Sequence, residues 1–495
     1  MVRRPLAQGR DIACTLADNV VDVLYPLIVV IRGLGRLAGA GQRWWVRTPR
    51  ERRGPALFLG AASALVVGLM PHGPLLAGGG LLAVAAWHGR GPRQGEPAEE
   101  RAARLQAVYE ALVPYFSLAE DTSPYPLYAH DGSWERVFLA YEFTSSGRLG
   151  RLLLRYPAYF RDGEPEARMR IQQVLCAKVG RGREYRFEWD EEENELEVTA
   201  LPPLPTDICA QRFVAAPGEM VLGFTDSDAV QRTVPVADGV ESRDVPPVVW
   251  RTGPRSTEPH LLALGQPGSG TTTLLRSVAL QALQHGDVLV IDGSGTGEYT
   301  CLAGRRGVLS VESTLVGALA SLEWAAHETE RRLLAANRAR QGGRPAPEDI
   351  DRPLWVLVDR PAVLSHLALT EGRPDPQKLL QVALRHGRAA RVTVALADQF
   401  EGADGLGQAI RAYTRARVVL GPATPDQARA VLGEPPHTTP LQQMPPGRGY
   451  ARLGSGPVHR LQVPVTPDPY DDSASEAHRA AVLALLPERP VPVRE

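Results

Sequence analysis

Lysine is almost absent from this chain of 495 residues. Lys178 and Lys378 are the only two, so arginine supplies nearly all of the 55 basic residues. The codon usage of a GC-rich genome accounts for such a bias. The 56 acidic residues bring the net charge to −1 at pH 7, which excludes a chain that coats nucleic acid through uniformly positive charge.

Cysteine is also scarce and widely spaced. The four cysteines are Cys14, Cys176, Cys209 and Cys301, with no C-x-x-C pair among them. The spacing predicts neither a disulfide framework nor a cysteine metal site, and it fits a reducing cytosol. Apolar residues make up 44% of the sequence, so a chain of this length has the material for two or three domains with real cores.

Long apolar runs are confined to the N-terminal region, residues 1–95. Two uncharged runs, residues 55–70 and 74–88, are short for a bilayer, which normally takes about 20 residues. Arginines flank the pair on both sides: Arg43, Arg47, Arg50, Arg52, Arg53, Arg90 and Arg93. By the positive-inside rule both ends lie in the cytoplasm. We therefore predict a transmembrane hairpin and a multi-pass protein of the cytoplasmic membrane, with the bulk of the chain in the cytoplasm; the alternative is a buried helical hairpin of a soluble domain.

A further apolar stretch, residues 12–31, contains Asp18 and Asp22. Each aspartate would cost about 2.5–3.5 kcal/mol at the centre of a bilayer. We interpret this stretch as an interfacial helix, with a third membrane span as the other option.

Residues 96–245 predict a small cytoplasmic α+β domain. The stretch "RVFLAYEF" is typical of a strand and "EPEARMRIQQVLCAKVG" of a helix that ends at Gly180. Apolar side chains alternate on both halves of "EYRFEWDEEENELEVTAL", which predicts a hairpin. No catalytic constellation is evident in this region.

Residues 246–465 alternate strands with helices. Buried strands are predicted at "HLLALG", "DVLVID", "PLWVLVD", "VTVALAD" and "RARVVLG". Such uninterrupted apolar runs between helices are typical of a parallel sheet covered on both faces. We predict a doubly wound α/β domain, followed by a C-terminal helix and tail in residues 466–495.

A phosphate-binding loop is predicted after the first of these strands. The sequence "LLALGQPGSGTTTLL" matches G-x-x-x-x-G-K-[ST] except that Thr271 stands where the lysine should be. The glycines permit a tight turn, and the start of the following helix offers amide groups to a phosphate. The predicted nucleotide-binding residues are Gly265, Gly268, Ser269, Gly270, Thr271, Thr272 and Thr273.

Residues 259–454 resemble the motor domain of the FtsK/SpoIIIE family of membrane-tethered, ring-forming P-loop ATPases. The resemblance rests on six stretches in the same order: "PHLLALGQPGSGTTTLL", "VLVIDGSG", "HETERRLLAANRAR", "LWVLVDR", "LRHGRAARVTVALADQF" and "RARVVLGPATPDQARAVLGEPPHTTPLQQMPPGRGYARLG". It implies a RecA-like P-loop fold that uses ATP and Mg²⁺. A winged-helix domain of about sixty residues often follows in relatives that pump DNA, and the remaining residues lack its pattern.

The resemblance also shows which catalytic groups this chain lacks. Thr272 retains the hydroxyl, and Asp359 the Walker B carboxylate, that would hold Mg²⁺. Asp359 and Gln399 would serve catalysis if the site were active. Arg360, however, stands where the family has the glutamate that activates water, and a cation cannot accept the proton of that water. The alternatives are that Lys178 or Lys378 replaces the missing lysine and that another carboxylate replaces the glutamate.

These observations predict a pseudo-ATPase with a structural or regulatory role in a membrane-associated translocation, division or secretion assembly. ATP and Mg²⁺ would bind weakly or not at all. The chain would join a homo- or hetero-oligomeric ring with an FtsK-like relative, and any DNA contact would be non-specific. The alternatives are an active ATP-dependent translocase of DNA or protein and a nucleotide sensor that binds without hydrolysis. The sequence does not identify the cargo, the partner or the ring size.

Overall fold

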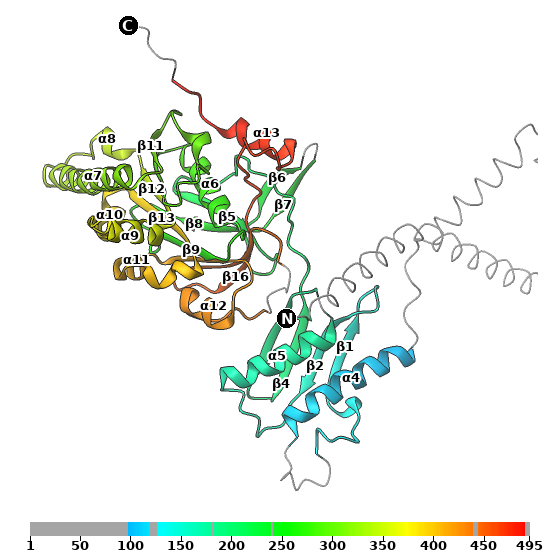
Figure 1. The fold of residues 1–495 in the computed structure, drawn as a ribbon. Coiled ribbons are helices and arrows are strands. Elements are labelled where there is room, and N and C mark those ends of the chain that lie inside the picture. Colours follow the sequence, from blue (N-terminus) through cyan, green and yellow to red (C-terminus); the bar gives the residue numbers. More distant parts are fainter. Residues whose placement is uncertain (1–97, 118–125, 181, 239–240, 439–443, 491–495) are drawn as a thin grey trace, which may run out of the picture. The chain divides into compact units, whose positions relative to one another are not determined.

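A computed structural model describes residues 98–117, 126–180, 182–238, 241–438 and 444–490 (Figure 1). Arg104–Glu142 and Leu149–Glu495 form one compact unit. The other unit, Met1–Ala103 with Phe143–Arg148, is described only at its edges. There the Thr144 amide donates to the Arg148 carbonyl over 2.8 Å, which closes a turn.

The predicted membrane location is contradicted by the structure. Within the described ranges, no helix has both the length and the apolar character that a membrane span requires. The helices that are long enough, α4 (Ala98–Phe116) and α7 (Leu315–Gln341), carry glutamate and arginine along their length. The expected hairpin of residues 55–70 and 74–88 and the expected interfacial helix of residues 12–31 lie outside the described residues.

A four-stranded sheet with strand order β1-β2-β4-β3 comes first along the chain. Its strands are β1 (Phe138–Phe143), β2 (Leu149–Arg155), β3 (Tyr185–Asp190) and β4 (Glu195–Ala200). The predicted hairpin is confirmed, because β3 pairs antiparallel with β4 and Phe187 lies opposite Val198. Helix α5 (Pro165–Val179) buries Ile171, Leu175 and Val179 and ends before Gly180, as the sequence predicts.

A ten-stranded sheet forms the core of the rest of the described chain, in the order β11-β10-β12-β13-β9-β14-β15-β16-β5-β8. Its strands are β5 (Glu219–Phe224), β8 (Pro247–Arg251), β9 (Leu261–Gly265), β10 (Asp287–Asp292), β11 (Val308–Glu312), β12 (Leu354–Asp359), β13 (Val392–Gln399), β14 (Ala416–Leu420), β15 (Arg448–Leu453) and β16 (Val458–Gln462). In the order of the sheet, the strands from β11 through β10, β12, β13 and β9 to β14 run parallel to one another. From β14 through β15, β16 and β5 to β8, each strand pairs antiparallel with the next. The fold is thus mixed α/β with a large, mostly parallel sheet.

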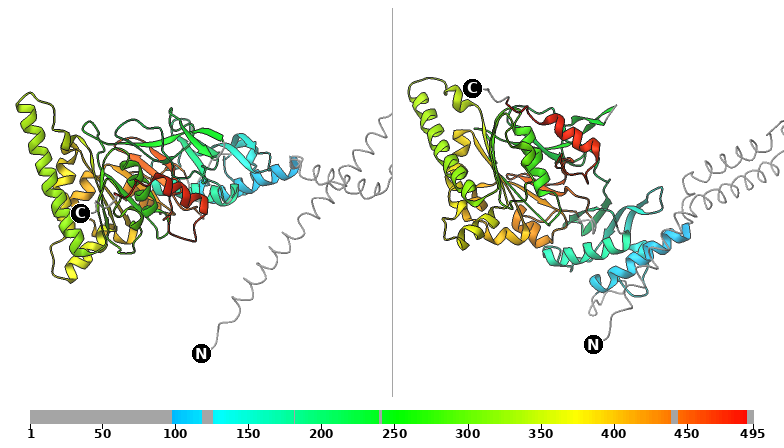
Figure 2. Two further views of the ribbon diagram at one scale, coloured as in Figure 1. Left: turned by 90° about the horizontal axis from the view of Figure 1, so that it is seen from above. Right: turned by 45° about the horizontal axis from the view of Figure 1, so that its top comes forward.

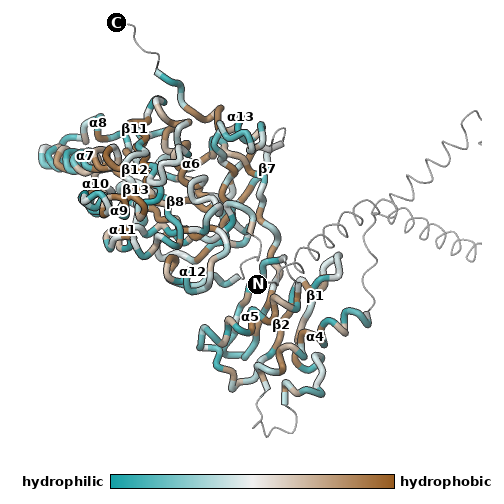
Figure 3. Tube along the Cα trace, viewed as in Figure 1, coloured by the Kyte–Doolittle hydropathy of each residue, from teal (hydrophilic) through white to brown (hydrophobic). Residues whose placement is uncertain are grey.

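Helices cover both faces of the parallel strands, which explains their uninterrupted apolar sequences. One face packs on α6 (Thr271–Ala282) and α13 (Glu476–Leu485), through residues such as Leu275 and Val482. The other face packs on α7, α9 (Pro361–Thr370), α10 (Leu380–Ala390), α11 (Gln408–Tyr413) and α12 (Pro425–Leu432). Figure 2 shows α7, in yellow-green, and α13, in red, on opposite sides of the sheet. The strands between them are hydrophobic (Figure 3).

The order of the strands places the carboxyl end of β9 at the centre of the sheet. If β9, β10, β12, β13 and β14 are counted one to five along the chain, the sheet reads 2-3-4-1-5. A large, mostly parallel sheet of this kind fits the P-loop ATPase fold expected from the sequence. Ligands of open α/β sheets bind at the carboxyl ends of the strands, where the order reverses. Gly265, Asp359 and Gln399 all lie at this edge.

Strand β5 belongs to the large sheet, although it precedes residue 246. A side-chain amide holds it in place: Gln281 of α6 accepts from the Val221 amide and donates to the Val221 carbonyl, each over 2.9 Å. The pairing of β5 with β8 shifts register between Val221 and Gly223. Gln281 therefore satisfies the strand where the regular pairing is interrupted.

Candidate nucleotide site

The phosphate loop joins the end of β9 to the start of α6. Gly268 (φ 76°) and Gly270 (φ 99°) adopt left-handed conformations that favour glycine. A Cβ atom on Gly265 would lie 2.9 Å from the Leu420 carbonyl oxygen. The glycines are therefore required by the backbone shape, as the loop motif predicts.

A second turn braces the loop from the side. The Gly447 amide, just before β15, donates to the Ser269 carbonyl over 2.8 Å. A Cβ atom on Gly270 would lie 3.2 Å from that same Gly447 nitrogen. The shape of the loop thus depends on a contact with the segment that leads into β15.

Three side chains meet at the carboxyl end of β12. The Thr272 hydroxyl donates to Oδ2 of Asp359 over 2.7 Å, and the Tyr299 hydroxyl donates to the same oxygen over 2.9 Å. Asp359 is 2% exposed, and its Oδ1 is buried with no hydrogen-bond partner in the described ranges. The structure therefore brings together Thr272 and Asp359, the two predicted Mg²⁺ ligands.

Burial dominates the electrostatics of Asp359. It raises the pKa of the carboxyl above its usual value, against the opposing effects of the Thr272 and Tyr299 hydrogen bonds and the Arg360 charge. A desolvated carboxylate with one unsatisfied oxygen beside a hydroxyl fits a hard cation such as Mg²⁺. In the part of the chain that is described, no cluster of three or more His, Cys, Asp or Glu side chains could hold a metal. Mg²⁺ would need the hydroxyl and ligands from outside the protein.

Arg360 follows Asp359 in a left-handed conformation (φ 56°, ψ 52°) and begins α9. This conformation is uncommon for a residue with a side chain, and such strain concentrates at functional sites. The Arg360 amide donates to the Ala397 carbonyl over 2.7 Å, which holds the backbone in place. Burial raises the pKa values of both Asp359 and Asp398, and the positive charge of Arg360 opposes that rise. A cation therefore lies among the acidic groups of the site.

Asp398 is occupied by structural hydrogen bonds. Its Oδ2 accepts from the Ala362 amide over 2.9 Å, and its Oδ1 accepts from the Gln399 amide over 2.8 Å. Burial raises the pKa of the Asp398 carboxyl. The side chain thus joins the start of α9 to the end of β13. Gln399, which would serve catalysis if the site were active, lies opposite Gly265 in the register of β13 and β9.

Asp292 likewise organises its own loop. It lies opposite Asp359 in the register of β10 and β12. One oxygen accepts from the Ser294 hydroxyl over 2.7 Å and from the Gly295 amide over 3.1 Å, and the other accepts from the Gly297 amide over 2.8 Å. Both oxygens of Asp292 therefore accept hydrogen bonds from the turn that follows β10.

Thr271, which stands where the loop motif predicts a lysine, is buried in the loop. It is 6% exposed, and its methyl carbon would lie 2.9 Å from a Cβ atom placed on Gly265. The short side chain is thus packed against the loop and carries no charge. Lys178 lies in α5 and Lys378 in a 3₁₀ turn before α10, and both are exposed.

Sequence reasoning missed Tyr299 and the arginine behind it. Arg276 of α6 is buried, donates to the Thr466 carbonyl over 2.9 Å and pairs with Glu298 over 2.8 Å. Its guanidinium lies 5.9 Å from the Tyr299 ring centroid. The sequence signal was weak, because Tyr299 is seven residues after Asp292 in a glycine-rich loop.

Comparison with known proteins gives structural likenesses only. A scan against protein-family models finds no match, and neither does a search of curated proteins. The fold is similar to the pCW3 conjugation coupling protein TcpA in its monomer form with ATPgS, at 15% identity and a TM-score of 0.43, over 77% of this chain and 99% of that one.

Two further solved structures are also similar. The cytoplasmic domain of the Thermomonospora curvata secretion ATPase EccC shares 21% identity at a TM-score of 0.37, over 59% of this chain and 33% of that one. EssC (ATPases 2 and 3) from Geobacillus thermodenitrificans shares 15% identity at a TM-score of 0.42, over 58% of this chain and 52% of that one. This chain thus spans about a third of the EccC structure and half of the EssC structure. At such low likeness, we argue function from the residues of this chain.

Proposed function

We propose that this protein is a pseudo-ATPase: a P-loop protein that holds ATP weakly, does not hydrolyse it, and has a structural or regulatory role in a translocation assembly. The observation that carries the proposal is the pair Asp359 and Arg360. The first keeps a carboxylate at the end of β12, and the second introduces a cation at the position where water would lose its proton.

Two described carboxylates close to Asp359, at the ends of the neighbouring strands β10 and β13, are already engaged in hydrogen bonds. Asp292 and Asp398 use both of their oxygens to organise backbone turns and helix starts. General-base catalysis needs a group that can accept a proton within hydrogen-bond reach of the water. Asp359 itself is engaged by two hydroxyl groups on one oxygen, in the arrangement of a cation ligand.

Nucleotide binding would be weakened rather than abolished. Charge-assisted hydrogen bonds contribute roughly 1.5–3 kcal/mol, so loss of the lysine corresponds to an affinity lower by about ten- to a hundredfold. The loop still presents the first turn of α6 to a phosphate. We assign the nucleotide contacts to Gly265, Gly268, Ser269, Gly270, Thr271, Thr272 and Thr273, and the Mg²⁺ contacts to Thr272 and Asp359.

The setting of the proposal comes from the sequence resemblance to ring-forming FtsK/SpoIIIE motors. A subunit that cannot hydrolyse ATP would act by joining a ring with an active relative or with its own copies. Contact with DNA would be non-specific, through arginines. Two of the similar solved structures are titled as a conjugation coupling protein and as a type VII secretion ATPase, so DNA and secreted proteins are the cargoes to test first.

ATP binding and turnover of the purified full chain test the proposal. We expect a fluorescent ATP analogue to bind in the presence of Mg²⁺ and phosphate release, with or without DNA, to match that of the Asp359→Ala variant. DNA-stimulated turnover that Asp359→Ala abolishes would reject the pseudo-ATPase in favour of an active translocase. That alternative is favoured by one observation, the intact contact between Thr272 and Asp359.

A further inference from the structure

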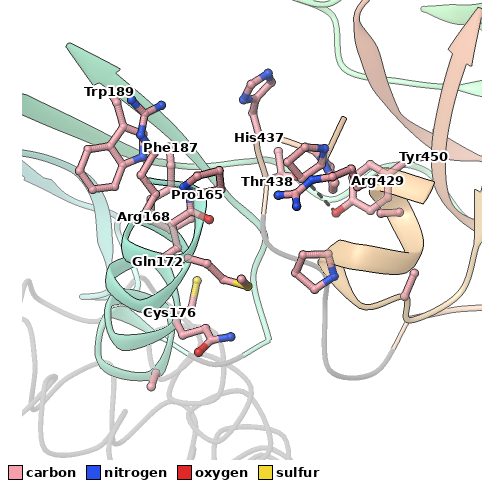
Figure 4. Close-up of a pocket in the computed structure, with 18 of the residues that line it drawn as sticks. Pro165, Arg168, Gln172, Cys176, Phe187, Trp189, Arg429, His437, Thr438 and Tyr450 are labelled. Atoms are coloured by element: carbon pink, nitrogen blue, oxygen red, sulfur yellow. Dashed lines mark hydrogen bonds between the residues drawn. The ribbon is translucent and has the colours of Figure 1, made fainter. Parts of the chain in front are cut away.

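A cavity of about 670 Å³ lies between α5 and α12 (Figure 4), and its lining includes no residue of the phosphate loop. All of its lining residues belong to the unit formed by Arg104–Glu142 and Leu149–Glu495. Arg168, Gln172 and Cys176 project from α5, and Arg429 projects from α12 on the other side. The volume is in the range of sites for small organic ligands, about 300–1,000 Å³.

Strand β3 supplies an aromatic wall at the edge of its sheet. Phe187 and Trp189 face the cavity, and Tyr450 of β15 lies across from them. The wall is held together by backbone pairing, because the Phe187 amide donates to the His437 carbonyl over 3.1 Å. The Tyr450 hydroxyl accepts a hydrogen bond from Thr438 over 2.9 Å. The aromatic rings are thus fixed before any ligand arrives.

The charge of the lining is positive. Arg168, Arg183 and Arg429 line the cavity, and Glu191 is the acid among the lining residues. Arg168 pairs with Glu191 and stacks over Trp189, with its guanidinium 5.4 Å from the ring centroid. Arg429 pairs with Asp426 at 3.8 Å, and its side chain is 43% exposed. Its guanidinium can therefore turn toward an anion.

One polar atom on the wall is left unsatisfied. The indole Nε1 of Trp189 is buried, and within the described part of the chain it has no hydrogen-bond partner. Buried donors are nearly always paired in folded proteins, so this indole nitrogen is an exception.

We propose that this cavity binds a small amphipathic anion: a flat aromatic or apolar body that packs against Phe187, Trp189 and Tyr450, with a carboxylate, sulfonate or phosphate group that meets Arg429. The aromatic wall provides apolar contact and stacking, and the guanidinium provides a charge-assisted hydrogen bond. This inference does not depend on the proposed pseudo-ATPase function, and it is tested without nucleotide.

The experiment uses the full chain and 8-anilinonaphthalene-1-sulfonate as the probe, followed by its fluorescence. N-phenyl-1-naphthylamine, which has the same rings without the sulfonate, is the matched neutral probe. We expect Arg429→Glu to weaken binding of the sulfonate probe by at least about fivefold, which corresponds to about 1 kcal/mol, and to leave the neutral probe unaffected. Gln172→Trp, which fills the cavity, should weaken both. Arg340→Glu, the same change on exposed α7, should alter neither.

Alkylation of cysteine gives a second readout that does not depend on the variants. Cys176 lines the cavity, whereas Cys209 is also half-buried but lies outside it. The bound sulfonate probe should slow iodoacetamide labelling of Cys176 and leave Cys209 unchanged, as followed by peptide mass spectrometry. The proposal is overturned if the probe protects neither cysteine, if both cavity variants bind like the parent chain, or if the neutral probe binds as tightly as the sulfonate.

Discussion

The hydroxyl of Thr272 lies 2.7 Å from Oδ2 of Asp359 and donates a hydrogen bond to it. This contact joins the first turn of α6 to the carboxyl end of β12, the two elements that hold Mg²⁺ in P-loop enzymes. The next residue, Arg360, is a cation. Under the proposed function, Thr272 and Asp359 would hold Mg²⁺, and Arg360 would stand in place of the catalytic base.

The buried Asp359 carboxyl should make stability depend on pH. Its pKa is raised in the fold, so the folded state holds a proton more tightly than the unfolded state does. The stability that the group contributes therefore falls as pH rises from about 3.9, the unfolded value, through the raised folded value. Asp359→Asn removes this effect. We expect the difference in Tm, variant minus parent, to be larger at pH 8 than at pH 4, as measured by differential scanning fluorimetry. A difference that is constant or shrinks with pH would contradict the assignment.

Restoring the missing cation should strengthen nucleotide binding. Thr271→Lys returns a lysine to the loop, where charge-assisted hydrogen bonds to the terminal phosphates contribute roughly 1.5–3 kcal/mol. We expect the affinity for a fluorescent ATP analogue to rise by about ten- to a hundredfold in an equilibrium titration. Thr370→Lys, the same change at the exposed end of α9, is the control and should leave the affinity unchanged. Equal affinities of the Thr271→Lys variant and the parent would argue against nucleotide at this loop.

Because Arg360 has a left-handed backbone conformation, the stability of a variant should depend on which residue replaces it. Glycine adopts it without strain, whereas a β-branched side chain does so at a cost of about 1–2 kcal/mol. Arg360→Val should therefore be less stable to urea than Arg360→Gly by about that amount, because both variants lose the same charge and differ in backbone strain. If the two unfold at the same urea concentration, residue 360 is not left-handed in solution.

A buried ionic cluster should be essential to stability. Glu184, at 3% exposure, pairs with Arg448 over 3.3 Å and with Arg460, and Arg460 also pairs with Asp226 over 2.7 Å. Glu184→Ala leaves buried arginines short of a partner, which costs about 3–5 kcal/mol. Glu188→Ala, four residues along on the exposed side of β3, should change the free energy of unfolding by less than about 0.5 kcal/mol. Urea denaturation measures both, and similar small losses would show that the cluster is not stabilising.

The strands and helices of the parallel sheet could be predicted because local pattern and tertiary environment agree there. Leu261–Gly265 carries no polar side chain, Leu354–Asp359 carries none before Asp359, and both strands are buried throughout. Helix α12 begins at Pro425 and is followed by the left-handed Gly433, as its residues indicate. The loop glycines were identified for the same reason, since their backbone conformations exclude other residues.

Other features depend on contacts that no local pattern reveals. Strand β5 is held in the large sheet by pairing with β8 and by the side chain of Gln281, sixty residues away. Tyr299 reaches Asp359 through folding of a glycine-rich loop, and Arg448 reaches Glu184 across 264 residues. The predicted membrane location was wrong: no described helix is long and apolar enough to cross a membrane. The prediction rested on the hydropathy of residues 55–70 and 74–88, which lie outside the described ranges, and that local pattern does not determine the helices of the rest of the chain.

Phosphate release by the purified full chain, with saturating ATP, Mg²⁺ and DNA, tests the central claim most directly. The parent chain should release phosphate no faster than its Asp359→Ala variant, because Arg360 cannot accept the proton of the attacking water. The Thr271→Lys, Arg360→Glu double variant shows whether the assay would detect turnover at a restored site. DNA-stimulated phosphate release by the parent chain that disappears in Asp359→Ala would contradict the account.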